Sequence, residues 1–265
     1  MVAGKHTSDR RKMTDEAAAL QAHRHPHIVR FEGMYEVPGR PNETMLLTEL
    51  CAGGNLQSQI DSHQFGMKPR DILRAVSQLA SALHHLHSRG FFHTDFKPAN
   101  VFIRSLAPMD VVLGDMADVQ PVGGKNLRGL GTQWLYSPEI WKQRVAVGPS
   151  DDIWALGISV MAMCGQLPRF ECRLMKNGRT SKPRYEVFPR QCLEHLAELR
   201  RLNPGHGLVE LMGKMVTRTM GERSQAYGIM FMADTLLGQW ERKEGDAGEE
   251  LGIKSPEGFV PPSFW

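Results

Sequence analysis

The sequence predicts an α+β chain with two lobes, a small lobe that contains strands followed by a larger helical lobe. Two β-like runs, at 28–35 and 44–50, lie within the first fifty residues. A long amphipathic pattern follows at 69–87. Further helical patterns occur at 191–202, 207–217 and 224–239. A chain of 265 residues can bury roughly 70–75% of its unfolded surface, which suits one bilobal domain.

The small lobe is expected to begin with a helix at 14–23. Asp15 and Glu16 would lie in its first turn, where the helix dipole favours acidic residues. Pro26 ends this pattern, and the letters VPGRPNE indicate a turn between the two strands. After Cys51, the letters AGGN indicate a flexible link to the second lobe.

The large lobe is expected to begin with the helix at 69–87, which ends before Gly90. Its apolar residues recur with a period near 3.6 residues and predict one buried stripe. The stripe consists of Ile72, Leu73, Val76, Leu79, Ala80, Leu83 and Leu86. Short strands are expected at 101–104 and 111–113, and Ser150 is the expected N-cap of a buried helix. The tail from Arg242 onward is rich in Gly, Pro and Glu and indicates a loop or surface strap.

Composition excludes several classes of protein. The net charge is only +3, and the sequence lacks the basic stripe that is typical of a nucleic-acid-binding protein. The most apolar run, 153–164, is shorter than the about 20 residues that span a bilayer. The amino-terminal letters form no secretory signal, and the four cysteines have no disulfide-framework spacing. We therefore expect reduced thiols and a cytoplasmic or nuclear location.

The residues that indicate chemistry lie on one loop. Asp95, Lys97 and Asn100 fall between the amphipathic helix and a short apolar strand, and Asp115 follows a second apolar strand. Phosphoryl transfer to a hydroxyl requires a carboxylate to accept its proton, a cation near the phosphate, and oxygen ligands for Mg²⁺. These four residues supply that set.

The segment from His93 to Asn100 resembles the catalytic loop H-R-D-L-x-x-x-N of protein kinases, and Asp115 begins an altered D-F-G. The resemblance implies that Asp95 is the catalytic base and Lys97 the phosphate-contacting lysine. It implies that Asn100 and Asp115 hold Mg²⁺, with ATP as phosphate donor. The Lys-Pro-x-Asn ending resembles serine/threonine kinases, which implies a protein substrate with Ser or Thr.

Other segments resemble the same family in the same order. Ser137-Pro138-Glu139 is similar to A-P-E, and Arg223 resembles the arginine that pairs with this glutamate. Asp152 resembles the aspartate that holds the catalytic loop. The letters 46–51 resemble the hinge, which implies that Thr48 is the gatekeeper, that backbone groups of Glu49 and Cys51 face adenine, and that Asn55 lies near the ribose.

The amino-terminal part departs from the family pattern. Only four residues precede Lys5, so the glycine-rich loop has no room, and we expect a chain cut short at its start or one that lacks two strands. By resemblance, Lys5 and Glu16 form the Lys–Glu pair of the ATP site. The expected division is a partial small lobe at 1–51, the helical lobe at 52–240 and a tail at 241–265.

A second departure concerns regulation. Thr94 replaces the arginine of H-R-D. In the family, that arginine binds a phosphate group on the activation segment. No Ser, Thr or Tyr occurs between Met116 and Leu130. We therefore expect activity without phosphorylation in that stretch, while Thr132 at its edge remains a candidate site.

Alternatives stay open at this point. A pseudokinase that serves as a binding or scaffold module would explain the missing glycine-rich loop, and a small-molecule phosphotransferase of the aminoglycoside-kinase-like type uses a similar loop. The histidines at 23, 25 and 27 suit packing or surface roles better than a metal site, because a proline interrupts the pattern.

Overall fold

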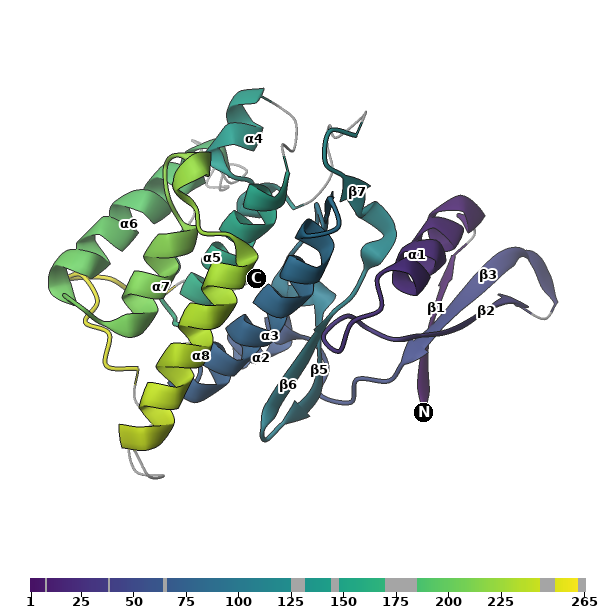
Figure 1. Cartoon of the computed structure of the whole chain (residues 1–265), viewed down its shortest axis with the longest axis horizontal. Coiled ribbons are helices and arrows are strands. Elements are labelled where there is room, and N and C mark those ends of the chain that lie inside the picture. The colour runs from purple at the N-terminus through teal and green to yellow at the C-terminus, as the bar shows by residue number, and fades with distance from the viewer. Residues whose placement is uncertain are drawn as a thin grey trace, which may run out of the picture.

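The structure is a computed structural model that describes residues 1–7, 9–37, 39–63, 66–124, 132–143, 148–169, 185–243 and 251–261. Its α-helices and strands follow the predicted order of a small mixed lobe and a large helical lobe (Figure 1). The helices are α1 (Arg10–Ala22), α2 (Leu56–Ser62), α3 (Pro69–His87), α4 (Pro138–Gln143), α5 (Pro149–Met163), α6 (Phe188–Leu202), α7 (Gly207–Met215) and α8 (Ala226–Lys243).

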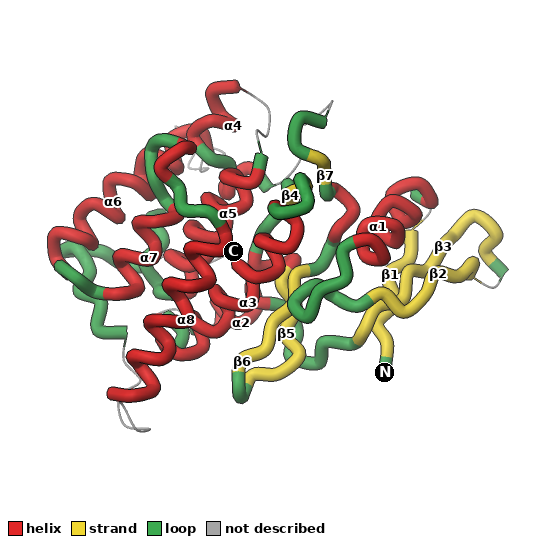
Figure 2. Tube along the Cα trace, viewed as in Figure 1, coloured by secondary structure: helices red, strands yellow, loops and turns green. Residues whose placement is uncertain are grey.

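The strands form three small antiparallel sheets. They are β1 (Val2–Thr7), β2 (Phe31–Val37), β3 (Arg40–Glu49), β4 (Phe91–Phe92), β5 (Val101–Leu106), β6 (Met109–Leu113) and β7 (Gln120–Pro121). The sheet of the small lobe has the order β1-β3-β2, while β4 pairs with β7 and β5 with β6. Figure 2 shows the three-stranded sheet and α1 at one end of the molecule and most of the helices at the other, with β4 and β7 beside the large-lobe helices. The chain division at 1–51, 52–240 and 241–265 remains a prediction.

Helix α1 starts earlier than the sequence predicts. The Asp9 side chain accepts a hydrogen bond from the backbone N–H of Lys12 (3.0 Å) and so caps the helix. Asp15 and Glu16 therefore lie inside the helix rather than in its first turn. The prediction was wrong because Arg10, Arg11 and Lys12, which are good helix formers, were left outside the pattern.

The core of the large lobe confirms the predicted stripe of α3, whose seven residues are all buried. Helix α5 is buried from Asp151 to its last residue, as its apolar sequence indicates. It begins at Pro149 with Gly148 as N-cap, so Ser150 is not the cap residue. Asp151 supplies the capping acceptor instead, because its side chain accepts a hydrogen bond from the Gly148 N–H (3.2 Å).

The link between the lobes is ordered rather than flexible. The Gly53 N–H donates to the Ile103 carbonyl (2.9 Å), and the Ile103 N–H donates to the Gly54 carbonyl (2.9 Å). A side chain at Gly53 would collide with Ile103, so the close approach of the two backbones requires glycine there. The link is thereby fixed against β5.

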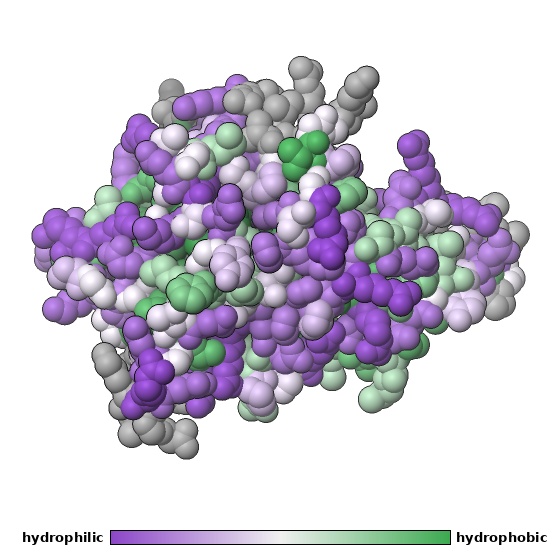
Figure 3. Space-filling view, in the orientation of Figure 1, coloured by the Kyte–Doolittle hydropathy of each residue, from purple (hydrophilic) through white to green (hydrophobic). Residues whose placement is uncertain are grey.

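Hydrophilic side chains cover most of the face seen in Figure 3, with apolar ones in small separate groups. Among the residues that the structure describes, no helix has the length and apolar character needed to cross a membrane.

Candidate active site

The predicted loop brings Asp95, Lys97 and Asn100 into direct contact. Lys97 Nζ donates to Asp95 Oδ2 (2.6 Å), and Asn100 Nδ2 donates to the Asp95 carbonyl (2.9 Å). A residue that sequence reasoning did not place here joins them, because the Thr132 hydroxyl donates to Asp95 Oδ1 (2.9 Å). Asp95 is only 9% exposed, so its carboxylate is partly removed from water, and these hydrogen bonds fix its orientation.

The loop is fixed by Asp152 from the first turn of α5. Its carboxylate accepts hydrogen bonds from the backbone N–H groups of His93 (2.8 Å) and Thr94 (3.1 Å), and it contacts His87 Nε2 (2.8 Å). Asp152 is 2% exposed, so these partners replace the water that it loses. The loop conformation thus depends on a buried carboxylate of another element, as the family resemblance implied.

His93 joins the loop to the segment that carries Asp115. Its ring is fully buried, and Nε2 lies 2.9 Å from the Gly114 carbonyl. The Gly114 N–H in turn donates to the Asn100 carbonyl (2.8 Å). Asp115 therefore follows directly after a residue bonded to Asn100, and the two predicted metal ligands lie on adjoining backbone. His93 therefore has a packed, supporting role in the loop.

Lys5 of β1 connects the small lobe to this site. Its Nζ forms ion pairs with Glu16 Oε2 of α1 (2.9 Å) and with Asp115 Oδ1 (2.8 Å). Burial favours the neutral form of Lys5, but the hydrogen bonds to Asp115 and Glu16 prevail and raise its pKa. Burial likewise opposes the charged form of Asp115, yet the hydrogen bond from Lys5 lowers its pKa below the ordinary value. Burial raises the pKa of Glu16 despite the same lysine.

Two residues at the site adopt unusual backbone conformations. Thr94 has a φ of 69° and Asp115 a φ of 52°, and they are the non-glycine residues with positive φ in the described part of the chain. Such strain costs on the order of 1–3 kcal/mol per residue and tends to occur at functional sites. The Thr94 hydroxyl donates to the Asp118 carbonyl (2.7 Å), and this bond holds the segment from Asp115 to Asp118 against the loop.

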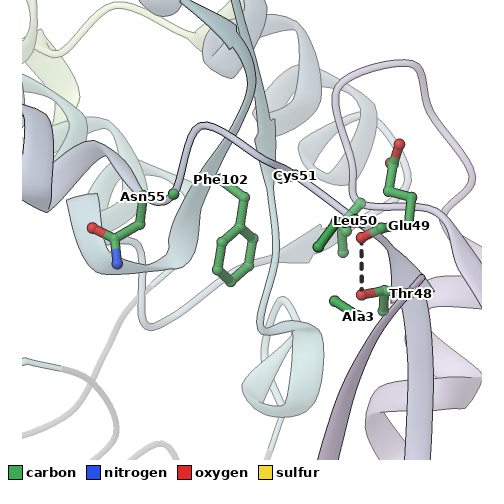
Figure 4. A pocket seen from close by; sticks show the side chains of 9 residues that line it. Ala3, Thr48, Glu49, Leu50, Cys51, Asn55 and Phe102 are labelled. Carbon is green, nitrogen blue, oxygen red and sulfur yellow. Dashed lines mark hydrogen bonds between the residues drawn. The ribbon is translucent and has the colours of Figure 1, made fainter. Parts of the chain in front are cut away.

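A cavity of about 280 Å³ lies at the hinge between the lobes. It is lined by Ala3, Val29, Thr48, Glu49, Leu50, Cys51, Gly54, Asn55 and Phe102. Figure 4 shows the Phe102 ring between Asn55 and Ala3. The volume is near the lower end of the range for ligand pockets, about 300–1,000 Å³, and suits a flat ring rather than a whole nucleotide.

The four hinge residues predicted from the sequence all line this cavity. The Glu49 side chain points away from it (Figure 4) and pairs with Arg104 (2.7 Å), so only its backbone can serve a ligand. Asn55 caps α2, because its side chain accepts a hydrogen bond from the Ser58 N–H (2.9 Å). Sequence reasoning missed Phe102 and Val29, although alternation in β5 would have found Phe102: its neighbours Val101 and Ile103 are buried, which turns Phe102 to the other face.

Asn100 and Asp115 form a donor set that suits Mg²⁺. The ion prefers oxygen ligands and usually combines one or two protein groups with phosphate oxygens. Asn100 uses its Nδ2 for Asp95, which leaves the amide oxygen as its ligand atom. Within the described ranges, no group of three or more His, Cys, Asp or Glu side chains is placed to hold a metal ion. The amide oxygen of Asn100 and the carboxylate of Asp115 are two oxygen ligands, which suits an ion that phosphate oxygens would also bind.

Comparison with known proteins assigns the chain to a family. A sequence model of the protein kinase domain matches residues 2–232. The chain belongs to the protein kinase family. The matched span contains both lobes and every predicted site residue of this kinase domain, and it ends before the segment 251–261.

Curated relatives of the kinase domain carry protein-kinase names, and two of the three described next are named serine/threonine-protein kinases. The chain is 29% identical to mouse serine/threonine-protein kinase Nek3 over 174 residues, 64% of the chain and 33% of the relative. It is 30% identical to the rice CBL-interacting protein kinase 4 over 180 residues, 66% of the chain and 39% of the relative. It is 29% identical to human serine/threonine-protein kinase Nek2 over 215 residues, 74% of the chain and 46% of the relative. The alignments thus span less than half of the length of each relative.

The pair predicted to support the kinase activation segment is present. Arg223 Nη2 donates to both carboxylate oxygens of Glu139 (2.9 and 2.8 Å). The Arg223 side chain is fully buried and lies over the Trp154 ring at 5.0 Å. The expected pairing of Arg223 with Glu139 is confirmed, with a buried arginine and a partly buried glutamate.

Proposed function

We propose that this chain is an active serine/threonine protein kinase domain, which transfers the γ-phosphate of ATP to a Ser or Thr hydroxyl of a protein substrate. One arrangement supports this function above all. The carboxylate of Asp95 is held by Lys97, Asn100 and Thr132, and the adjoining Asp115 is joined through Lys5 to Glu16.

Each residue has a proposed task. Asp95 accepts the proton of the substrate hydroxyl, as a carboxylate within hydrogen-bond reach can do. Lys97 places a cation beside Asp95, where the transferring phosphate would pass. Lys5 presents a second cation from the small lobe, and its bond to Glu16 fixes the position of α1.

The same geometry supports our proposal for the binding roles. Asn100 and Asp115 would hold Mg²⁺, which supplies charge neutralisation on the phosphate oxygens when it is bound. The hinge cavity, with Thr48, Cys51, Asn55 and the backbone of Glu49 on its wall, would take the adenosine part of ATP. The proposed partners are thus ATP, Mg²⁺ and a protein substrate.

The test measures transfer of labelled γ-phosphate from Mg-ATP to a basic and an acidic generic protein substrate. We expect transfer by the full chain and a loss of about 10²–10⁴-fold in Asp95→Asn. Asp61→Asn is the matched control, because Asp61 is exposed on α2 and bonds to Gln57 rather than to the site.

Other results would assign a different function. Labelled phosphate on an aminoglycoside but on no protein would indicate a small-molecule phosphotransferase. A thermal shift with Mg-ATP but no transfer to any acceptor would indicate a pseudokinase that binds nucleotide.

The loop also supports activity without phosphorylation of the activation segment. The Thr94 hydroxyl bonds the Asp118 carbonyl directly, and Asp118 pairs with Lys12 of α1 (3.7 Å). These contacts join α1, the catalytic loop and the segment from Asp115 to Asp118, and none of them involves a phosphate group. Residues 125–131, where part of the predicted phosphate-free stretch falls, lie outside the described residues. Mass spectrometry of active protein with activating phosphate at Thr132 would refute this part of the proposal.

A further inference from the structure

The segment 251–261, here named the C-terminal strap, is docked on the large lobe beyond the kinase-family match. Asn203 is only 6% exposed, and both the nitrogen and the oxygen of its side-chain amide form hydrogen bonds with the strap backbone. Its Nδ2 donates to the Lys254 carbonyl (2.8 Å), and its Oδ1 accepts from the Lys254 N–H (2.7 Å). His206 Nε2 lies 2.9 Å from the Leu251 carbonyl. In Figure 1 the strap is the yellow segment beside α6 and α7.

Apolar contacts complete the docking. Leu251 packs against Gly66, where an added Cβ would collide with the leucine side chain, and Gly66 has a φ of 105° that favours glycine. At the other end of the strap, the ring of Phe259 lies 4.5 Å from the ring of His195 on α6. The strap therefore packs into a complementary site on the large lobe, where both polar and apolar contacts hold it.

Ser255, in the middle of the strap, makes a contact that needs a neutral hydroxyl. Its Oγ lies 3.0 Å from Gln166 Nε2, from which it accepts, and 3.2 Å from Gln166 Oε1, to which it donates. Gln166 is 6% exposed at the end of α5, whereas Ser255 itself is exposed. The hydroxyl is thus both accessible from outside and bonded to a buried amide.

Sequence context separates Ser255 from the other serines. The chain contains two Ser-Pro pairs, Ser137-Pro138 and Ser255-Pro256. Ser137 is fully buried and donates to Asp151 (2.7 Å), so no enzyme can reach it in the folded chain. Ser255 is exposed, lies in a stretch without helix or strand, and is followed by proline. We propose that Ser255 is a phosphorylation site for a proline-directed protein kinase, and that its phosphorylation releases the strap from the large lobe.

The chemistry explains the release. The Ser255 oxygen would bond to the γ-phosphorus of ATP held by the modifying kinase, the bond from that phosphorus to the β-phosphate oxygen would break, and ADP and the hydroxyl proton would leave. The product carries about 1.5–2 negative charges at pH 7 and no longer has the hydroxyl proton. It cannot donate to Gln166 Oε1, and its charge faces that carbonyl oxygen. A group that bonded both ends of the amide would now repel one of them.

The experiment treats the full chain with a purified proline-directed kinase and ATP, and maps phosphate by mass spectrometry. Hydrogen exchange of peptides from 251–261 is then compared with and without treatment. We expect phosphate at Ser255 and none at Ser137, with exchange of the strap amides faster by about tenfold, because the phosphate loses the bond to Gln166 Oε1 and repels that oxygen. The result does not need this chain's own activity, so Asp95→Asn should behave in the same way.

Three variants make the outcome decisive. Ser255→Ala and Pro256→Ala should take up no phosphate at this position, and treatment with the kinase should leave the strap exchange of each variant unchanged. Asn203→Ala should show fast strap exchange without any phosphate, which identifies the released state. The proposal is overturned if the kinase modifies a free peptide of sequence 251–261 but not Ser255 in the folded chain. It is equally overturned if Ser255 is fully phosphorylated while strap exchange stays unchanged.

Discussion

The two lobes contribute to the candidate site in different ways. On the large-lobe side, Asp95, Asn100 and Asp152 are at most 9% exposed, and each makes more than one hydrogen bond within the lobe. On the small-lobe side, the ion pairs to the segment after β6 come from Lys5 at Asp115 and from Lys12 at Asp118, and both lysine side chains are 50% exposed. The large lobe therefore builds a loop that several buried bonds fix at once, whereas the small lobe reaches the site through half-exposed cations.

This difference separates stability from activity. Substitution of the buried residues that hold the catalytic loop should lower the free energy of unfolding and also disturb the site. The reason is that the same hydrogen bonds stabilise the fold and position the catalytic residues. Changes at Lys5 should alter the site alone, because an ion pair in contact with water adds little to stability.

The largest effect is expected from Asp152→Ala. The substitution leaves the buried backbone N–H groups of His93 and Thr94 without an acceptor, at about 1–3 kcal/mol each. We expect urea unfolding to show a loss of about 2–6 kcal/mol, together with loss of phosphate transfer. Asp152→Asn keeps one oxygen acceptor and should lose less. A stable Asp152→Ala protein with normal transfer would show that the loop does not depend on α5.

The Arg223–Glu139 pair tests a buried support outside the catalytic loop. Arg223→Met leaves the Glu139 carboxylate without its partner, and breaking such a pair costs about 3–5 kcal/mol. The double variant Arg223→Met, Glu139→Leu should recover much of that loss, because it removes the unpaired charge as well. Denaturant unfolding of the two single variants and the double variant measures the coupling, and simple additivity would contradict a direct interaction.

Sequence reasoning succeeded where the relevant residues are close along the chain. Asp95, Lys97 and Asn100 lie within six positions, so one loop had to bring them together, and the stripe of α3 follows from a period that any helix shares. The family resemblance supplied longer pairings, such as Arg223 with Glu139. The contact of Lys5 with Asp115 spans 110 positions, and no local pattern could have predicted it.

The misses have local physical causes. The start of α1 was placed too late because acidic residues at its middle resembled a first turn, while the actual cap, Asp9, lies before a basic run. Phe102 was overlooked because a single aromatic residue in a strand is more often part of the core, and only the burial of both neighbours reveals that it faces the hinge cavity. The bond from Thr132 to Asp95 depends on how the chain returns after the activation segment, which spacing does not specify.

Lys5→Met sharpens the comparison from the small-lobe side. We expect phosphate transfer to fall by about 10²-fold, the scale for loss of one electrostatic contact at a transition state. The free energy of unfolding should change by less than about 1 kcal/mol. Lys12→Met is the matched control, because Lys12 is also 50% exposed and pairs with Asp118 of the same segment, at 3.7 Å. Equal losses of activity in both variants would mean that general positive charge matters rather than the Lys5 position.

The smallest effect concerns the contact between the lobes away from the cleft, where the end of α1 meets α3. His25 Nδ1 accepts the His27 N–H (3.1 Å), and its ring lies 5.0 Å from that of His85. Burial, together with His85, His27, Arg89 and His84, lowers the pKa of His25 from 6.5 to about 4. Protonation of Nδ1 would also set a donor against the His27 N–H.

The direction of the pH effect follows from that shift. Because the folded pKa lies below the unfolded value, the unfolded chain binds the proton more readily, and stability is complete above pH 6.5 and falls as the pH approaches 4. We expect a loss on the order of 1–3 kcal/mol from His25 over this interval, measured by urea unfolding at several pH values. His25→Gln should flatten the pH dependence, though not abolish it, since burial also holds the pKa of His195 at about 4. An unaltered slope in His25→Gln would mean that the histidines between the lobes take no part in holding them together.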